Sequence, residues 1–206
     1  MTDKHQGKWL HVSEGRPFGY PYLIQFENGI IKHSLLKEIS ENLVIPESEE
    51  DKFNENVSSI IKLETIGPNR IRIFRKGIKH TVIDNKESKT EDAIFEHDYV
   101  KLLPTKSFLS ESRIQLMKYN LNWNNEKLII EFNKILDKPY IQEMNKRLNR
   151  EGMKILLEKL DETLIVSILN DNERGLIMPI NLVDDKKMVL YGFPTEPYEV
   201  TANLIE

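Results

Sequence analysis

The stretch SSIIKLETIGPNRIRIFRKG, residues 58–77, sets the expectation for the whole fold. Ile61 and Leu63 alternate with charged residues before its Gly-Pro-Asn sequence. Ile71 and Ile73 alternate with arginines after it. This period of two places the apolar side chains on one face of each strand, and Gly-Pro-Asn favours a tight turn between the strands. The stretch therefore predicts an antiparallel hairpin with one apolar face.

The same pattern recurs along most of the chain. YPYLIQF places Tyr22, Ile24 and Phe26 on one face, and Asn28-Gly29 follows as a type I′ turn sequence, because both residues tolerate positive φ. Further strands are expected at KHTVID (79–84), AIFEHDYVKLL (93–103), IIEF (129–132), MKILLEKL (153–160), TLIVSIL (163–169), LIMPINLV (176–183), MVLYGF (188–193) and YEVTANLI (198–205). The acidic sequence PESEEDKFNEN (46–56) is interpreted as a surface loop. A mainly β fold follows.

Two segments, residues 34–43 and 137–152, favour helices instead. Apolar residues recur there at helical spacing: Leu36, Ile39 and Leu43 in the first segment, and Ile141, Met144 and Leu148 in the second. Ser34 and Asp137 are suitable N-terminal caps. Because each half then has a strand, a helix and a hairpin in the same order, we expect one helix in each half.

This shared order indicates two related β-rich units, residues 1–104 and 110–206, each built as an antiparallel barrel. The strand ending LIQF (23–26) in the first half corresponds to IIEF (129–132) in the second. Two alternatives remain open. Any two β-rich segments with a helix look alike at this level, and all the strands could instead close into one larger barrel.

Composition narrows the classes of partner. The chain has 206 residues and a net charge of −4, with acidic and basic residues divided evenly between its halves. Binding to nucleic acid or to an anionic membrane is therefore not expected, because both depend on an excess of Lys and Arg. The chain has no cysteine, which excludes disulfides, thiolate nucleophiles and cysteine-based zinc sites.

Membrane insertion and export are not expected either. The longest apolar runs, such as GLIMPI, are far shorter than the ~20 residues of a membrane-spanning helix. The N-terminal sequence MTDKHQGKWLHV contains no apolar segment of signal-peptide length. If the natural chain begins here, a cytoplasmic location follows.

The sequence GKW at residues 7–9, the hairpins after it and FEHDYVKLLPT at 95–105 resemble small bacterial lipocalin-like proteins of the calycin type. The resemblance covers about residues 7–103. It implies that Gly7 and Trp9 lie on the first strand and that the Trp closes the floor of a barrel. It also implies a fold that often holds an apolar small molecule.

Members of that family pack a basic residue on the Trp, and Arg70, Arg72 and Arg75 all compete for this place. The same three arginines are also interpreted as a basic strip on one face of the strand, and we expect this face to be exposed to solvent. The second half has no Gly-x-Trp, so if the halves are copies, the second has lost or replaced the floor.

Alternation around Trp9 suggests which residues would contact a ligand. The expected binding residues share the inward face: Trp9, His11, Ile24, Phe26, Ile71 and Ile73. His11 is included because it has the same parity as Trp9 along the strand. We therefore expect a non-enzymatic protein that binds a small apolar or amphipathic molecule. Because the inward residues are bulky, the alternative is a filled barrel that serves as an interaction module for a protein partner or a second copy.

The histidines give a third hypothesis. All five lie in the first 97 residues: His5, His11, His33, His80 and His97. Imidazole is a good ligand for Zn, Cu and Fe, so barrel closure could assemble a metal or haem site. No pair has the i, i+2 or i, i+4 spacing of a compact ligand motif, so no metal ligand is assigned and no cofactor is identified. No catalytic residue is assigned either, since adjacent His33 and Ser34 point to opposite strand faces.

Overall fold

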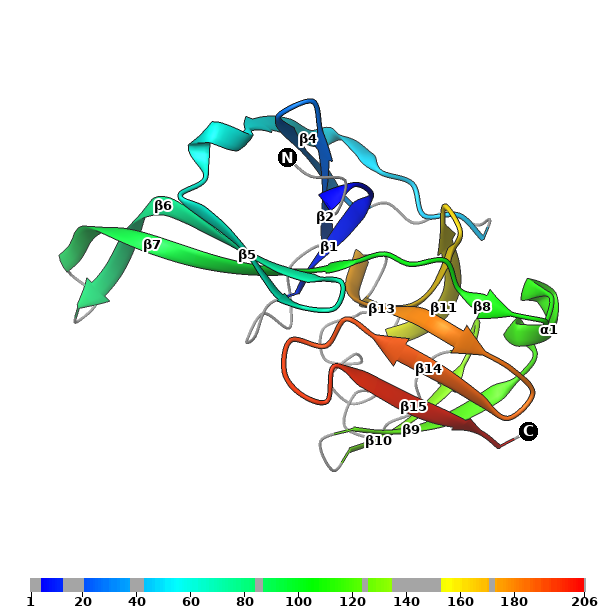
Figure 1. The fold of residues 1–206 in the computed structure, drawn as a ribbon. Helices are drawn as coiled ribbons and strands as arrows, with labels where there is room; N and C mark the ends of the chain where they lie inside the picture. The colour runs from blue at the N-terminus through cyan, green and yellow to red at the C-terminus, as the bar shows by residue number, and fades with distance from the viewer. Residues whose placement is uncertain are drawn as a thin grey trace.

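The fold is almost entirely β, and its strands form two curled sheets (Figure 1). The computed structural model describes residues 5–12, 21–37, 43–83, 87–123, 126–134, 153–170 and 173–205. The first sheet is built from strands within residues 8–101, and the second from strands within residues 106–204. The expected mainly β, antiparallel architecture is confirmed. That the halves are related copies or separate domains stays a prediction.

The first sheet has seven strands in the order β4-β3-β2-β1-β7-β6-β5. Their bounds are β1 Lys8–Val12, β2 Tyr22–Glu27, β3 Ile30–Leu35, β4 Ser48–Asn56, β5 Lys62–Gly67, β6 Arg70–Ile83 and β7 Glu87–Lys101, with a short 3₁₀ helix at Val57–Ser59. Both expected hairpins are present. Asn28 (φ 49°) and Gly29 (φ 81°) turn β2 into β3, and Asn69 (φ 55°) lies in the turn from β5 to β6. Residues that tolerate positive φ therefore set both turns.

The second sheet follows the order β10-β9-β15-β14-β13-β12-β11, with β8 pairing in parallel with β13. The bounds are β8 Lys106–Ser107, β9 Lys118–Trp123, β10 Glu126–Glu131, β11 Met153–Leu160, β12 Thr163–Asn170, β13 Glu173–Val183, β14 Lys187–Tyr191 and β15 Glu199–Leu204, with one short helix, α1, at Glu111–Gln115. The strands expected in this half are all found. Asp161 (φ 52°) makes the turn between β11 and β12.

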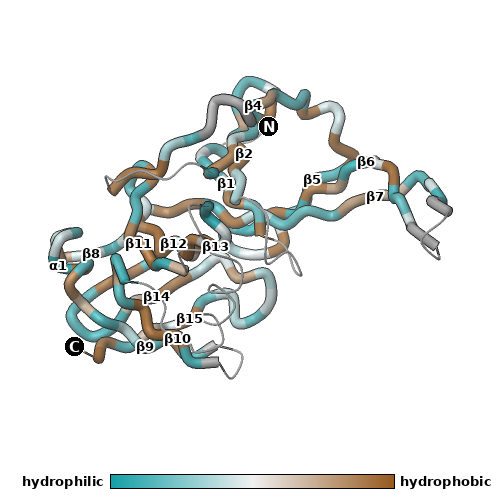
Figure 2. The backbone as a smooth tube through the Cα atoms, turned by 180° about the vertical axis from the view of Figure 1, so that it is seen from behind, coloured by the Kyte–Doolittle hydropathy of each residue, from teal (hydrophilic) through white to brown (hydrophobic). Residues whose placement is uncertain are grey.

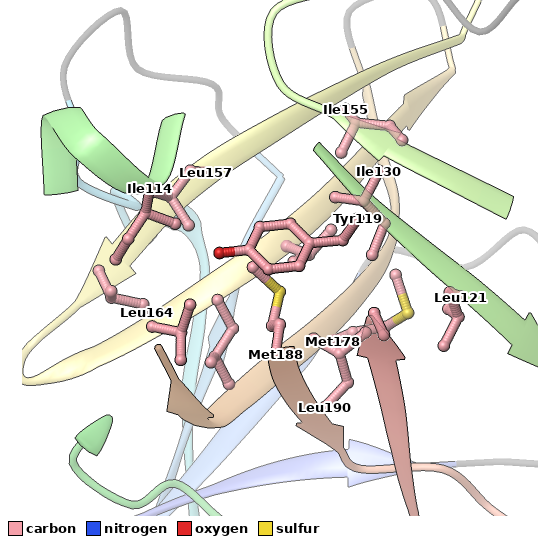
Figure 3. Packing of buried hydrophobic residues seen from close by; sticks show 14 of the residues in the cluster. Ile114, Tyr119, Leu121, Ile130, Ile155, Leu157, Leu164, Met178, Met188 and Leu190 are labelled. Atoms are coloured by element: carbon pink, nitrogen blue, oxygen red, sulfur yellow. The ribbon is translucent and has the colours of Figure 1, made fainter. Parts of the chain in front are cut away.

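Three buried clusters hold the sheets together. The largest lies within the second sheet, where the Tyr119 ring packs among Met178, Met188 and aliphatic side chains (Figure 3). The second joins the halves, since Leu10 and Val100 of the first sheet belong to the same cluster as residues of the second. The third fills the first sheet around Trp9, as described below. Figure 2 shows hydrophobic segments gathered where β11, β12 and β13 run through the middle of the molecule.

Some expectations differ from the structure. Ser34 lies inside β3 opposite Leu23 and does not begin a helix, because a strand partner satisfies its backbone. The segment 46–56, interpreted as a loop, contributes β4. The segment 79–84 continues β6 and is not a separate strand. The helix expected at 137–152, like residues 38–42 of the first expected helix, lies outside the described residues, so one helix per half is not confirmed.

Candidate functional site

An open hollow of about 550 Å³ lies on the concave face of the first sheet. Its walls come from five strands: Tyr22, His33, Ser34, Leu35, Lys52, Phe53, Glu55, Arg75, His97 and Tyr99. Strand pairing explains the gathering, because directly opposed residues share a face and His33 is opposite Phe53. The volume lies within the ~300–1,000 Å³ typical of small-molecule sites.

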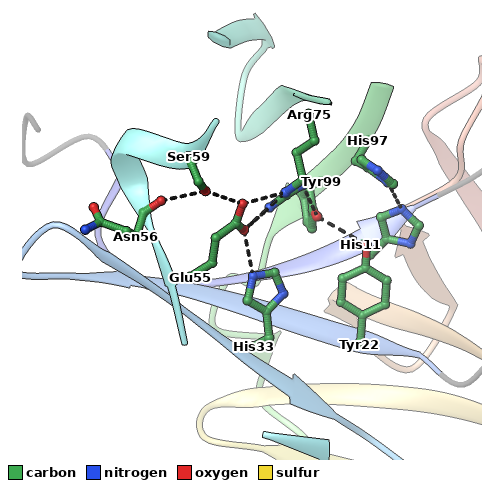
Figure 4. A network of polar contacts seen from close by, with 9 residues as sticks. All are labelled: His11, Tyr22, His33, Glu55, Asn56, Ser59, Arg75, His97 and Tyr99. Carbon is green, nitrogen blue, oxygen red and sulfur yellow. Dashed lines mark hydrogen bonds and ion pairs between the residues drawn. The ribbon is translucent and has the colours of Figure 1, made fainter. Parts of the chain in front are cut away.

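A network of charged and phenolic groups forms one wall of the hollow (Figure 4). The Nε of Arg75 donates to both carboxylate oxygens of Glu55, at 3.2 and 3.1 Å, and Nη2 donates to Oε2 at 2.9 Å. The remaining terminal nitrogen, Nη1, donates to the Tyr99 hydroxyl at 3.1 Å. That hydroxyl lies 3.2 Å from the hydroxyl of Tyr22. The guanidinium plane is therefore fixed by partners on two sides.

Glu55 is ionised in this network. Burial would raise the pKa of its carboxyl group, but hydrogen bonds from Arg75, Ser59 and His33 together with the Arg75 charge lower the pKa to about 2. Ser59 Oγ donates to Oε1 at 2.7 Å, and His33 Nε2 lies 3.0 Å from Oε2. Because Glu55 already accepts from three side chains, its role is to hold Arg75 and His33 in place.

His33 is held as a neutral ring. Burial lowers its pKa, the charge of Arg75 lowers it further, and the hydrogen bond to Glu55 opposes both effects. An ionised carboxylate only accepts hydrogen bonds, so Nε2 of His33 carries the ring proton. Nδ1 is then an acceptor, on the side of the ring toward Tyr22 (Figure 4).

Aromatic rings surround these polar groups. His11 stacks on Tyr22 with ring centroids 4.3 Å apart, and its Nε2 lies 3.4 Å from Nδ1 of His97. The run of rings continues across the neighbouring strands, because Phe53 stacks on His33 at 4.0 Å with an interplanar angle of 10°. The walls thus present flat apolar surface beside fixed hydrogen-bonding groups.

The predicted binding residues all belong to this side of the first sheet, but most lie below the hollow. Five of them are buried together in the cluster that also contains Tyr99: Trp9, Ile24, Phe26, Ile71 and Ile73. None of the five lines the hollow. His11 does not line the hollow either, but it contacts two residues that do, because it stacks on Tyr22 and its Nε2 lies beside Nδ1 of His97. Trp9 and its neighbours are thus packed against one another in a buried cluster.

The basic residue near Trp9 is also different from those considered. Lys101, directly opposite Trp9 on β7, places its Nζ 5.8 Å from the centre of the indole ring. The three arginines do not form a strip on one face. Arg72 pairs with Asp98, at 2.6 Å from Nε to Oδ1, whereas Arg75 lies at odd spacing from it and faces the hollow.

The histidines do not gather as a metal site. Nowhere in the described ranges do three His, Asp or Glu side chains converge on one point. His11 and His97 meet, and His33 lies across Tyr22 from His11, but His80 is exposed in the distal part of β6. The carbonyl of His5 accepts a hydrogen bond from Trp9 Nε1 at 3.0 Å.

The sequence did not assign Phe53, Glu55 or Arg75 to the binding site, although Arg75 was one of the three arginines considered beside Trp9. Phe53 and Glu55 alternate within β4, but five acidic residues in the segment 46–56 made it resemble a solvated loop. The spacing of three residues between Arg72 and Arg75 was the available signal, since an odd spacing reverses the strand face. The partner of Arg75 follows only from curling of the sheet, which alternation does not encode.

Comparisons with known proteins add no further assignment. No family model, curated protein or solved structure matches the chain. In the part of the chain that the structure describes, we find no helix with the length and apolar character needed to cross a membrane.

Proposed function

We propose that the hollow of the first sheet binds a small amphipathic molecule without catalysing its conversion. The observation that carries the proposal is the combination, in one hollow of about 550 Å³, of stacked aromatic rings with a guanidinium fixed by a carboxylate. Small-molecule sites typically pair apolar walls with a few placed polar groups. The lipocalin-like resemblance is compatible with this proposal, with the ligand seated above the filled floor.

The aromatic walls would receive the apolar part of the ligand. Phe53 is largely exposed although it stacks on His33, and Tyr22 is only partly buried. Exposed aromatic faces gain the most when a ligand removes them from water. A planar or ring-containing ligand therefore suits these walls best.

Arg75 would orient the polar part of the ligand. A guanidinium has five N–H groups, and the hydrogen bonds to Glu55 and Tyr99 described above use one N–H on each of its three nitrogens. Each terminal nitrogen therefore keeps one N–H that takes no acceptor among the described residues. A carbonyl, carboxylate or sulfonate on the ligand would accept from this end of the side chain.

Titration with 1-anilinonaphthalene-8-sulfonate, a dye with aromatic rings and one sulfonate, tests the proposal through its fluorescence. We expect saturable binding, and we expect Phe53→Ser to weaken it about tenfold, which corresponds to about 1.4 kcal/mol. Phe108→Ser is the matched control, because Phe108 is fully exposed and lies outside the hollow. Equal affinities for the two variants would overturn the proposal, since the dye would then bind exposed phenylalanine in general.

A second pair of variants tests the polar contact. Arg75→Gln should weaken dye binding, whereas Arg72→Gln on the opposite face of the same strand should leave it unchanged. Circular dichroism of both variants would show that the sheet is retained. Native mass spectrometry of protein purified from producing cells would then show whether a natural ligand of this class is carried along.

A further inference from the structure

The strands β6 and β7 extend beyond the first sheet as a two-stranded arm (Figure 1). They pair with each other along residues 70–83 and 87–100. The neighbour of β6, β5, reaches only to Phe74, and the neighbour of β7, β1, begins only at Asp98. Beyond those points no described strand pairs with either outer edge of the arm. An isolated two-stranded ribbon is marginally stable in water, so the arm favours a partner.

One face of the arm carries two exposed isoleucines in a compact quartet. Lys76 lies opposite Ile94, and Ile78 lies opposite Asp92, so the four side chains stand on the same face. Ile78 is 59% exposed and Ile94 is 62% exposed. They occupy one diagonal of the quartet, and Lys76 and Asp92 occupy the other. A hollow of about 380 Å³ lies among them, with Gly77 and Ala93 also in its lining.

The two charges of this quartet differ from those on the opposite face. There, Lys79 pairs with Glu91 at 3.8 Å, and the Phe95 ring covers Gly77 so closely that an added Cβ would lie 2.6 Å from it. Lys76 and Asp92, by contrast, take no ion-pair partner within the described ranges. One face of the arm is thus satisfied internally, and the other presents exposed isoleucines between charges of opposite sign.

We propose that the quartet Lys76, Ile78, Asp92 and Ile94 binds the same face of a second copy of this chain. A two-fold axis along the diagonal from Ile78 to Ile94 places each isoleucine against its own equivalent. The same rotation places Lys76 opposite Asp92 of the second copy, and Asp92 opposite Lys76 of the second copy. The face is therefore self-complementary in shape and charge, which is the requirement for a closed two-fold dimer.

The diagonal axis also fixes how the arms meet. The two ribbons cross at a large angle, as sheets do in orthogonal packing. The contact is small compared with the ~1,600 Å² of a standard interface, so the dissociation constant of the dimer is expected to be micromolar or higher. This inference is independent of the proposed ligand site, because the quartet lies on the arm and on the opposite face of β6 from Arg75.

Sedimentation velocity over a concentration series, up to ~1 mM, tests the proposal. We expect the wild-type mass to rise from 24.2 kDa toward twice that value. Lys76→Glu and Asp92→Lys should each remain monomeric, because each places like charges opposite one another. All these side chains are solvent-exposed or on an exposed ribbon, so the substitutions should leave the fold intact.

Mixing the two variants is the decisive experiment. In a mixed dimer every charged contact again joins opposite signs, so an equimolar mixture of Lys76→Glu and Asp92→Lys should dimerise although neither does alone. Lys79→Glu, on the other face of the arm, is the matched control and should dimerise like the wild type. A monomeric wild-type chain at every concentration, no recovery on mixing, or equal loss of dimer in Lys79→Glu would each overturn the proposal.

Discussion

Arg75 and Glu55 meet at 2.9 Å from Nη2 to Oε2, although four strands separate β6 from β4 in the order of the first sheet. In a flat sheet these strands would lie about 24 Å apart, at ~4.8 Å per strand. The contact therefore requires that the sheet curls until its two sides face each other. The pair connects the sides of this half-barrel and at the same time forms the wall of the hollow.

Glu55→Gln should destabilise the protein in a pH-dependent way. The folded-state pKa of Glu55, about 2, is below its ordinary value of 4.5, so the ionised pair stabilises the fold above pH 4.5 and loses this effect as pH falls toward 2. The loss in unfolding free energy should be about 1–2 kcal/mol at pH 7, since solvent screens part of the interaction. Urea unfolding of both proteins from pH 7 to pH 2 measures the difference.

The control for this experiment is Glu64→Gln. Glu64 pairs with Lys62 at the exposed edge strand β5, where an ion pair contributes little, and its loss should change stability by less than ~0.5 kcal/mol. A wild-type minus Glu55→Gln difference that stayed constant down to pH 2 would contradict the assignment of the effect to this carboxylate.

His33 should titrate below pH 6.5 in the folded protein, because burial and the charge of Arg75 lower its pKa. Since protons then bind the unfolded chain more readily, this residue removes stability as pH falls below 6.5. Glu55→Gln should lower the His33 pKa further, because the carboxylate raises it in the wild type. Carbon-proton NMR of the ring, with the urea-unfolded protein as reference, gives both values. A higher His33 pKa in Glu55→Gln than in the wild type would contradict the contact between His33 and Glu55.

Ile73→Ala should weaken the fold without weakening ligand binding. Ile73 is fully buried next to Trp9 and does not line the hollow. Truncation of such a residue costs about 2–5 kcal/mol through lost contacts and the cavity left behind. Denaturation and dye titration of the same sample separate the effects. A tenfold loss of dye affinity with little loss of stability would indicate instead that the dye binds among the buried residues around Trp9.

The strands were predictable because alternation is a local property. Ile71 and Ile73, for example, alternate with arginines whether or not the sheet is curled, and Asn28-Gly29 encodes its turn within two residues. The resulting face was also predictable, since five of the six expected binding residues are buried together on it. The lining of the hollow above these residues was not predictable. It depends on β4, whose acidic sequence resembles a loop until its strand partners are known.

The contact between Glu55 and Arg75 could not be predicted from local sequence patterns. The two residues are 20 positions apart, and neither has a local sequence feature that identifies the other. Their distance follows from the curl of seven strands, which is set by packing around Trp9 and Tyr99 over the whole sheet. Alternation assigns a side chain to a face, and only the register and curvature of every intervening strand assign it a neighbour.

Arg174 of β13 forms a buried ion pair with Glu158 of β11 and also contacts the first half of the chain. Arg174 is 0% exposed, and it donates from Nε and Nη2 to the Glu158 carboxylate, at 2.8 and 2.6 Å. Its Nη1 donates to the carbonyl of Leu36, which follows β3 of the first sheet. Arg174→Met should therefore cost about 3–5 kcal/mol, because it leaves a buried carboxylate without its partner.

The double variant Arg174→Met/Glu158→Leu should be more stable than either single variant, because apolar side chains of similar size remove the buried charge altogether. Denaturant unfolding of the four proteins completes a double-mutant cycle, and its coupling energy measures the pair directly. The double variant should still lose part of the stability, since the Leu36 carbonyl has lost its donor. Strictly additive losses would show instead that the two side chains contribute independently.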